Sequence, residues 1–266
     1  MKTSDKVAIA IIGGSGIYDP GMFASSEKRK IYTPYGQPSA PIEIGEYKGL
    51  KVAFLPRHGE RHSIPPHAIN FRANIWALKE LGVERVLAPS AVGSLQEDCK
   101  PGELALPDQF IDRTWGRQGT FYDGGVVAHV SMADPFCPEL MDTLQKSAAE
   151  LRITLRRGGT YVCIQGPRFS TRAESKMFRS WGAKIVGMTL IPEVSLAREA
   201  RMCYCTIAAI TDYDVWADKP VSAEEVVKTM AESVDKVKRL LADALSNIPS
   251  TRRCSCGRHM DQAFMS

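Results

Sequence analysis

Residues 202–214 read MCYCTIAAITDYD, an apolar run that ends in two aspartates flanking a tyrosine. The run predicts a buried strand over residues 202–210. In α/β proteins, ligands bind at the carboxyl ends of parallel strands. Asp212 and Asp214 are therefore candidates for accepting hydrogen bonds from an amino group or for holding a proton. The competing interpretation is a solvated turn, in which aspartate is common.

A second segment of this kind lies just upstream, where the largely apolar residues 184–188 lead into Thr189-Leu190-Ile191-Pro192-Glu193. Apolar runs and helical periodicity alternate along the rest of the chain. Strands are predicted at residues 7–12, 51–55, 85–88, 161–164, 184–188 and 202–210, and helices at 69–81, 138–151, 172–181, 192–200 and 223–245. This alternation predicts an α/β fold, a single three-layer domain with a central mixed β-sheet flanked by helices. We expect the domain to span residues 1–247, followed by a cysteine-containing tail at 248–266.

The composition is that of a globular protein. The 266 residues are 44% hydrophobic and carry a net charge of +4, from 34 basic and 30 acidic side chains. The basic residues are dispersed, which argues against nucleic acid as a partner. No run approaches the roughly 20 apolar residues that cross a bilayer, so we expect no membrane partner and a cytoplasmic protein.

Seven cysteines are many for a cytoplasmic enzyme and an odd number for a secreted disulfide framework. Cys254-Ser255-Cys256 in the tail could close a small, reducible ring. With His259 it could also form half of a zinc site, but no second ligand pair follows in the sequence, so the metal interpretation is the weaker one.

Two early loops have the chemistry of anion binding. Gly13-Gly14-Ser15-Gly16 follows the first predicted strand and offers backbone amides and a hydroxyl. Arg57-His58 follows the second, and arginine binds phosphate through paired donors. A metal site at the local histidines is disfavoured because glycine and proline interrupt any continuous helix there, and the order His-Glu-x-x-His is lacking.

Two further segments supply hydroxyl and aromatic groups. Pro89-Ser90-Ala91-Val92-Gly93-Ser94 is predicted as a loop after the third strand, and Gly166-Pro167-Arg168-Phe169-Ser170 as a loop after the fourth. Phe169 can stack on a base, although ordinary core packing competes as an explanation.

Taken in order, these six motifs resemble the trimeric purine nucleoside phosphorylase family from about residue 7 to residue 247. The 6-oxopurine enzymes of that family carry a glutamate where this chain has Ser170 and an asparagine where it has Asp212. Adenine presents an amino donor, which needs an acceptor carboxylate, so the resemblance favours the methylthioadenosine branch.

The resemblance implies roles for individual residues. Asp212 and Asp214 would be catalytic, with Asp212 protonating purine N7 and Asp214 accepting from the 6-amino group. Phosphate would be bound by Ser15, Arg57, His58, Ser90, Ala91 and Thr189. The nucleoside would contact Phe169, Ser170, Met188, Asp212, Tyr213, Asp214, Ala223, Val226, Val227 and, from a neighbouring subunit, His129.

The implied reaction is phosphorolysis of methylthioadenosine to adenine and methylthioribose 1-phosphate, with inorganic phosphate as co-substrate and no cofactor or metal. The family further implies a homotrimer or a hexamer. Archaeal relatives with a Cys-x-Cys tail imply candidate disulfides Cys137–Cys203 and Cys254–Cys256. The alternatives are a 6-oxopurine nucleoside phosphorylase, a nucleoside hydrolase, and a nucleoside-binding protein without activity.

Overall fold

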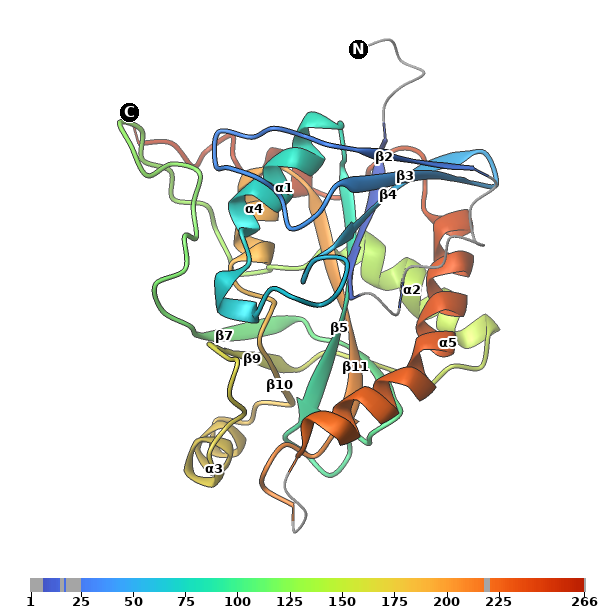
Figure 1. The fold of residues 1–266 in the computed structure, drawn as a ribbon, viewed down its shortest axis with the longest axis vertical. Helices are drawn as coiled ribbons and strands as arrows, with labels where there is room; N and C mark the ends of the chain where they lie inside the picture. Colours follow the sequence, from blue (N-terminus) through green and yellow to red (C-terminus); the bar gives the residue numbers. More distant parts are fainter. Residues whose placement is uncertain (1–6, 15–16, 18–24, 218–220, 266) are drawn as a thin grey trace.

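A computed structural model describes residues 7–14, 17, 25–217 and 221–265. Within them, one mixed β-sheet of eleven strands runs through the molecule with helices on both faces (Figure 1). The strands are β1 (Ile9–Gly13), β2 (Ser26–Arg29), β3 (Ile42–Tyr47), β4 (Leu50–Pro56), β5 (Arg85–Ser94), β6 (Leu104–Leu106), β7 (Gln109–Arg113), β8 (Leu155–Arg157), β9 (Thr160–Ile164), β10 (Ile185–Gly187) and β11 (Cys203–Asp212). The predicted α/β class with a central mixed sheet is confirmed.

The sheet branches at β5. Its main path runs β2-β3-β4-β1-β5-β10-β9-β7, while β11 pairs with β5 and with β6, which in turn pairs with β8. Strand β11 lies parallel to β5 along nearly all of its length. The other partners of β5 divide it between them, because β1 pairs in parallel with its first residues and β10 pairs antiparallel with its last.

The helices cover the sheet from two sides. They are α1 (Phe71–Glu80), α2 (Pro138–Glu150), α3 (Arg172–Ser180), α4 (Glu193–Glu199) and α5 (Ala223–Asn247), with short 3₁₀ turns at Pro66–Ala68 and Cys256–Arg258. Helices α1 and α4 lie together on one side, and α2 and α5 on the other (Figure 1).

Helix α5 shows why the periodicity in the sequence could be interpreted correctly. Its buried residues Val237, Leu240, Leu241, Ala244 and Leu245 recur at helical spacing along one face. At its start, the Ser222 side chain accepts a hydrogen bond from the Glu225 backbone N–H at 3.2 Å, which is the predicted N-cap.

All six predicted strands and all five predicted helices exist, with ends displaced by a few residues. The prediction of a loop at residues 89–94 was wrong, because this segment continues β5. Thr211 and Asp212 likewise belong to β11 rather than to the loop after it. Five strands were not predicted from the sequence: β2, β3, β6, β7 and β8. They are short or alternate in polarity, and none contains an apolar run of more than three residues.

The tail packs onto the body of the protein. Met260 is fully buried, Cys256 is nearly so, and Arg85 Nη2 donates to Pro249 O at 2.7 Å. In the described part of the chain, no helix is long and apolar enough to span a membrane.

Candidate active site

The candidate phosphate groups converge where the two partners of β5 separate. β1 pairs with β5 as far as Leu87, whereas β10 pairs with it only at Gly93 and Ser94. Beyond its last pair with β5, β1 continues toward Pro89, and a Cβ placed on Gly13 would lie 3.3 Å from Pro89 Cγ. Strand β10 runs antiparallel to β5, and Thr189 follows shortly after its end. Between these two strands, the edge of β5 that pairs with neither of them carries Ser90 and Ala91. We call this gap in the strand pairing the β5 opening.

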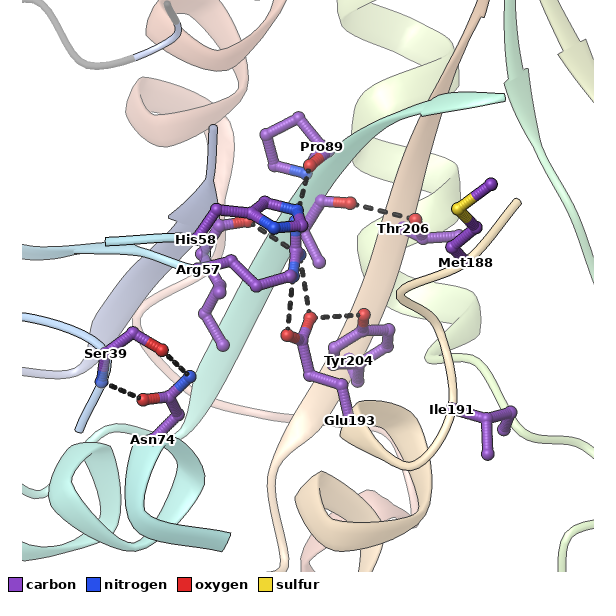
Figure 2. Close-up of polar contacts among 12 residues, drawn as sticks. Ser39, Arg57, His58, Asn74, Pro89, Met188, Ile191, Glu193, Tyr204 and Thr206 are labelled. Carbon is purple, nitrogen blue, oxygen red and sulfur yellow. Dashed lines mark hydrogen bonds and ion pairs between the residues drawn. The ribbon is translucent and has the colours of Figure 1, made fainter. Parts of the chain in front are cut away.

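Arg57 follows β4 and lies almost completely buried, with its guanidinium next to Pro89 of β5 (Figure 2). Its Nε donates to Glu193 Oε2 at 2.7 Å, and its Nη2 donates to Glu193 Oε1 at 2.8 Å. Nη1 donates to Pro89 O at 3.2 Å, and Nη2 also donates to Ile12 O at 3.0 Å. These contacts occupy four of the five N–H groups of the guanidinium and leave one on Nη1 for a ligand.

Glu193 neutralises this arginine within the protein. Burial disfavours the charged guanidinium, but the attraction of Glu193 outweighs it, and the net pKa of Arg57 is raised. The Tyr204 hydroxyl donates to Glu193 Oε1 at 2.8 Å (Figure 2). Burial, reinforced by the carboxylate, raises the pKa of Tyr204, so this tyrosine stays a donor. The arginine is thereby fixed in position without giving the opening a net positive charge.

His58 is held in one protonation state. Its Nδ1 lies 2.9 Å from Ile64 O, and burial together with the charge of Arg57 lowers the pKa of His58 to about 4. The ring is therefore neutral near pH 7 and donates its single N–H to the carbonyl. Its Nε2 then offers a lone pair, so His58 can act toward a ligand only as an acceptor.

Several buried polar atoms of this region have no hydrogen-bond partner among the described residues. They include Ser90 Oγ, Ser170 Oγ, Ser175 Oγ and Asp214 Oδ2. Buried polar groups in native proteins are nearly always paired, so each needs an explanation. Thr189 is also buried. Ser15, the remaining predicted hydroxyl, lies outside the described residues.

Asp212 ends β11, and local donors engage both of its oxygens. Thr211 Oγ1 donates to Oδ2 at 2.7 Å, and the Asp214 backbone N–H donates to Oδ1 at 2.7 Å. Burial still raises the pKa of Asp212 above its ordinary value, helped by the charge of Asp214. Gly93 makes room for this carboxylate, since a Cβ at Gly93 would lie only 2.8 Å from Asp212 Oδ1.

Asp214 differs from Asp212 in its hydrogen bonding, because its Oδ2 is buried without a hydrogen-bond partner among the described residues. Its backbone adopts φ 51°, in the left-handed region that aspartate tolerates better than most residues. Burial raises its pKa, while the hydroxyls of Ser175 and Ser170 lie near enough to lower it in part without forming well-directed hydrogen bonds. The two aspartates therefore share a buried position at the end of β11, and one of them has an open acceptor.

The base-side loops meet next to this pair. A Cβ on Gly166 would lie 2.6 Å from Met188 Sδ, so the loop that leads to Phe169 packs against Met188. Phe169 itself is half-buried. Arg117 holds the two loops together by donating to Met188 O at 2.9 Å and to Gln165 O at 2.7 Å.

The start of α5 also reaches the site, because Val221 N donates to Asp214 O at 3.2 Å and the charge of Glu225 acts on Asp212. Of the residues predicted to surround the 5′ group, Val226 is half-buried, Ala223 is exposed and Val227 is 69% exposed.

Tyr213 and His129, which were also predicted to contact the nucleoside, pack against other parts of this chain. Tyr213 packs edge-on against Trp216, with ring centroids 5.3 Å apart. His129 is exposed and its backbone N–H donates to Ala263 O at 2.7 Å, so within this chain it belongs to the segment that packs on the tail.

The predicted disulfides are not formed in this structure. Cys137, Cys203, Cys254 and Cys256 do come together, but all seven cysteines are free thiols. The sulfur atoms of Cys203 and Cys254 lie 3.4 Å apart, far beyond a covalent bond of about 2.05 Å.

The sequence analysis missed two residues that position others. Glu193 appeared only as part of a motif, and nothing in its local sequence signals that it pairs with the distant Arg57. Arg117 lies in a segment without regular secondary structure, and nothing in its local sequence signals that it joins two distant loops.

Comparison with known proteins identifies the family of this chain. The model of the phosphorylase superfamily matches residues 8–246. The S-methyl-5'-thioadenosine phosphorylase of Thermofilum pendens is 63% identical over 98% of this chain and 100% of its own length, and that of Pyrococcus horikoshii is 58% identical over 97% and 99%.

Solved structures give the same result. A methylthioadenosine phosphorylase from an antarctic soil metagenomic library superposes with a TM-score of 0.94 at 44% identity, covering 98% of this chain and 93% of that one. The methylthioadenosine phosphorylase of Schistosoma mansoni, in complex with adenine, has a TM-score of 0.89 at 40% identity, with 93% of both chains covered. The chain therefore belongs to the phosphorylase superfamily.

Proposed function

We propose that this protein catalyses the phosphorolysis of S-methyl-5'-thioadenosine to adenine and 5-methylthioribose 1-phosphate, a step of purine and methionine salvage. The names of the similar proteins support the reaction. The observation in the chain itself that carries the proposal is the acceptor Asp214 Oδ2, which is buried, unpaired and close to Ser170. An adenine amino group supplies the donor that this oxygen lacks, whereas the oxygen of a 6-oxopurine would repel it.

Phosphate binds, in this proposal, at the opening along β5. The hydroxyls of Ser90 and Thr189, the Ala91 amide and the free Nη1 N–H of Arg57 donate to its oxygens. His58 Nε2 accepts the single O–H of the monohydrogen phosphate. Because Glu193 already neutralises Arg57, the bound phosphate keeps its negative charge, which stabilises the positive ribose that develops as the glycosidic bond breaks.

Asp212 acts as the general acid in this scheme. Electrons flow into the purine as the bond to ribose breaks, and a proton on Asp212 passes to N7. The raised pKa of Asp212, caused by burial and by the neighbouring Asp214, favours the protonated form that this step requires. Phosphate then attacks the anomeric carbon from the opposite side, and no organic cofactor or metal takes part.

We further propose that the functional unit is a homotrimer, alone or as a dimer of trimers, in which His129 of one subunit completes the site of the next. Val126, Val127, Phe264 and Met265 are all about half exposed or more. They lie together, because Ala128 bridges to Phe264 and the Met265 backbone N–H donates to Val127 O. An apolar patch of this kind is typical of an interface between subunits. Sedimentation analysis tests the assembly, and a monomer would contradict it.

Product analysis tests the reaction. Methylthioadenosine and inosine are incubated separately with the protein and phosphate, the bases are separated by chromatography, and the sugar phosphate is identified by ³¹P NMR. We expect adenine and methylthioribose 1-phosphate, with methylthioadenosine strongly preferred. A preference for inosine would retain the phosphate site but contradict the role of Asp214, and the absence of any product would indicate a binding protein.

A further inference from the structure

Four cysteines from three distant parts of the sequence form one cluster. Cys137 precedes α2, Cys203 begins β11, and Cys254 and Cys256 lie in the tail. All four sulfur atoms lie within 4.8 Å of one another, and three of the four side chains are buried. The other described cysteines, such as Cys205 on the same strand, are also buried but lie outside this cluster.

The spacing of the sulfur atoms suits metal coordination. A zinc ion bound by four thiolates has Zn–S distances of about 2.3 Å, which places the sulfurs of a regular tetrahedron about 3.8 Å apart. The cluster has its Cys203–Cys254 contact at 3.4 Å and no separation above 4.8 Å. Two disulfides would instead need two pairs at about 2.05 Å, and no such pair exists among the described cysteines.

The surroundings also suit a charged thiolate site. Arg198, only 3% exposed, interacts electrostatically with Cys256, Cys137 and Cys203. Its positive charge would offset part of the net charge of −2 that four thiolates give to a bound divalent zinc ion. Buried charges are tolerated when they are compensated in this way.

The position of the cluster indicates a structural role. Cys203 and Asp212 stand at opposite ends of β11, nine residues apart, which is about 30 Å along a strand. Four protein ligands also leave no open position for a substrate. The Cys-x-Cys segment of the tail offers only one ligand pair, and the fold supplies the second pair from Cys137 and Cys203.

We propose that Cys137, Cys203, Cys254 and Cys256 bind one structural zinc ion that fastens the tail to the start of α2 and β11. Four thiol protons leave as the ion binds, and no oxidation or reduction is involved.

Metal and thiol analysis of the full-length protein tests the proposal. The protein is purified under argon without added metal or chelator, and zinc is measured by inductively coupled plasma mass spectrometry. Thiols are counted after denaturation in chelator without reductant. We expect one zinc per chain and all seven thiols. Three thiols and no zinc would mean two disulfides and would overturn the proposal.

Matched variants locate the ligands. Cys254→Ser with Cys256→Ser should abolish zinc binding, whereas Cys205→Ala, on the same strand as Cys203 and equally buried, should retain one zinc per chain. If the double variant kept its zinc, the cluster would not be the site.

A measurement on the wild-type protein does not depend on whether the variants fold. The reduced, metal-free chain is titrated with Co²⁺, and one equivalent should give the charge-transfer bands and intense visible bands of a tetrahedral tetrathiolate site. No spectral change, or the weak spectrum of an octahedral ion, would overturn the proposal even where all seven thiols are found.

Discussion

Glu193 holds Arg57 through two parallel hydrogen bonds, of 2.8 and 2.7 Å, and both side chains are almost completely buried. The pair joins the end of β4 to the start of α4, so it links two sides of the proposed phosphate site. We infer that Glu193 is a positioning residue, which acts on phosphate through Arg57 and does not touch it.

Replacing Glu193 by Gln should weaken both folding and phosphate binding. Removing one partner of a buried ion pair leaves the other charge uncompensated, at a cost of about 3–5 kcal/mol. The KM for phosphate should rise more than the KM for nucleoside. Denaturant unfolding and steady-state kinetics measure the two effects. Glu199→Gln is the control, because Glu199 is on the same helix and buried but binds Thr120 and Phe121; equal losses in both variants would contradict the positioning role.

Asp212→Asn should remove the proposed general acid. General acid catalysis typically contributes about 10²–10⁴-fold, so kcat/KM for methylthioadenosine should fall within that range. The pH profile of kcat should also lose the limb that reports this group. Near wild-type turnover of methylthioadenosine by Asp212→Asn would falsify the acid role.

Asp214→Asn should stabilise the protein near neutral pH although it impairs catalysis. A carboxyl whose pKa is raised in the folded state favours folding below its unfolded pKa near 3.8, and this contribution is lost as the pH rises through the folded value. Above that value the wild type buries a negative charge that the nearby hydroxyls of Ser175 and Ser170 stabilise only in part, whereas asparagine is neutral. The melting temperature of the ligand-free variant should therefore exceed that of the wild type at pH about 8, and the difference should shrink toward pH about 4. A lower melting temperature at pH about 8 would contradict this account.

Gly93→Ala tests how closely Asp212 must be placed. The added Cβ would lie 2.8 Å from Asp212 Oδ1, so the carboxylate has to move. A displacement of about 1 Å in a catalytic group can cost on the order of 10²-fold in rate, and we expect a loss of that size in kcat. Gly124→Ala, where a Cβ meets nothing within 4 Å, should leave kcat unchanged. Full activity of Gly93→Ala would show that the carboxylate position is not critical.

His58 should make the protein sensitive to acid. Its pKa is lowered to about 4 in the folded state, from an ordinary value of 6.5. A lowered pKa gives stability that is present above the unfolded value and is lost as the pH falls toward the folded one. The wild type should therefore lose about 3 kcal/mol relative to His58→Asn between pH about 6.5 and 4. The free energy of unfolding of both proteins is measured across this pH range. If the two values changed in parallel, His58 would not be buried as a neutral ring.

Local signals in the sequence were enough to predict the α/β class and most of the strands and helices that hold the site. Buried strands such as β11 are continuous apolar runs, and α5 repeats its apolar residues at helical spacing. The contacts that organise the site were not predictable in this way. Arg57 and Glu193 are separated by 136 positions, and no local pattern records their pairing.

Two features depend on packing between segments that are distant in the sequence. The segment at residues 89–94 was predicted as a loop because it contains proline, glycine and serines, yet β11 pairs with it along most of its length and keeps it a strand. The cysteine cluster could not be predicted from the sequence either. Cys137 and Cys203 meet the tail cysteines only because α2, β11 and the tail pack together, which the spacing of cysteines in the chain does not reveal.

The dependence of methylthioadenosine cleavage on phosphate concentration tests the central claim most directly. Initial rates of adenine release are measured from zero to saturating phosphate. We predict a saturable increase that extrapolates to no cleavage without phosphate. The reason is that the phosphate bound at the β5 opening is itself the nucleophile. A substantial rate at zero phosphate would mean that water attacks the ribose, and would contradict the assignment of this opening as a phosphate site.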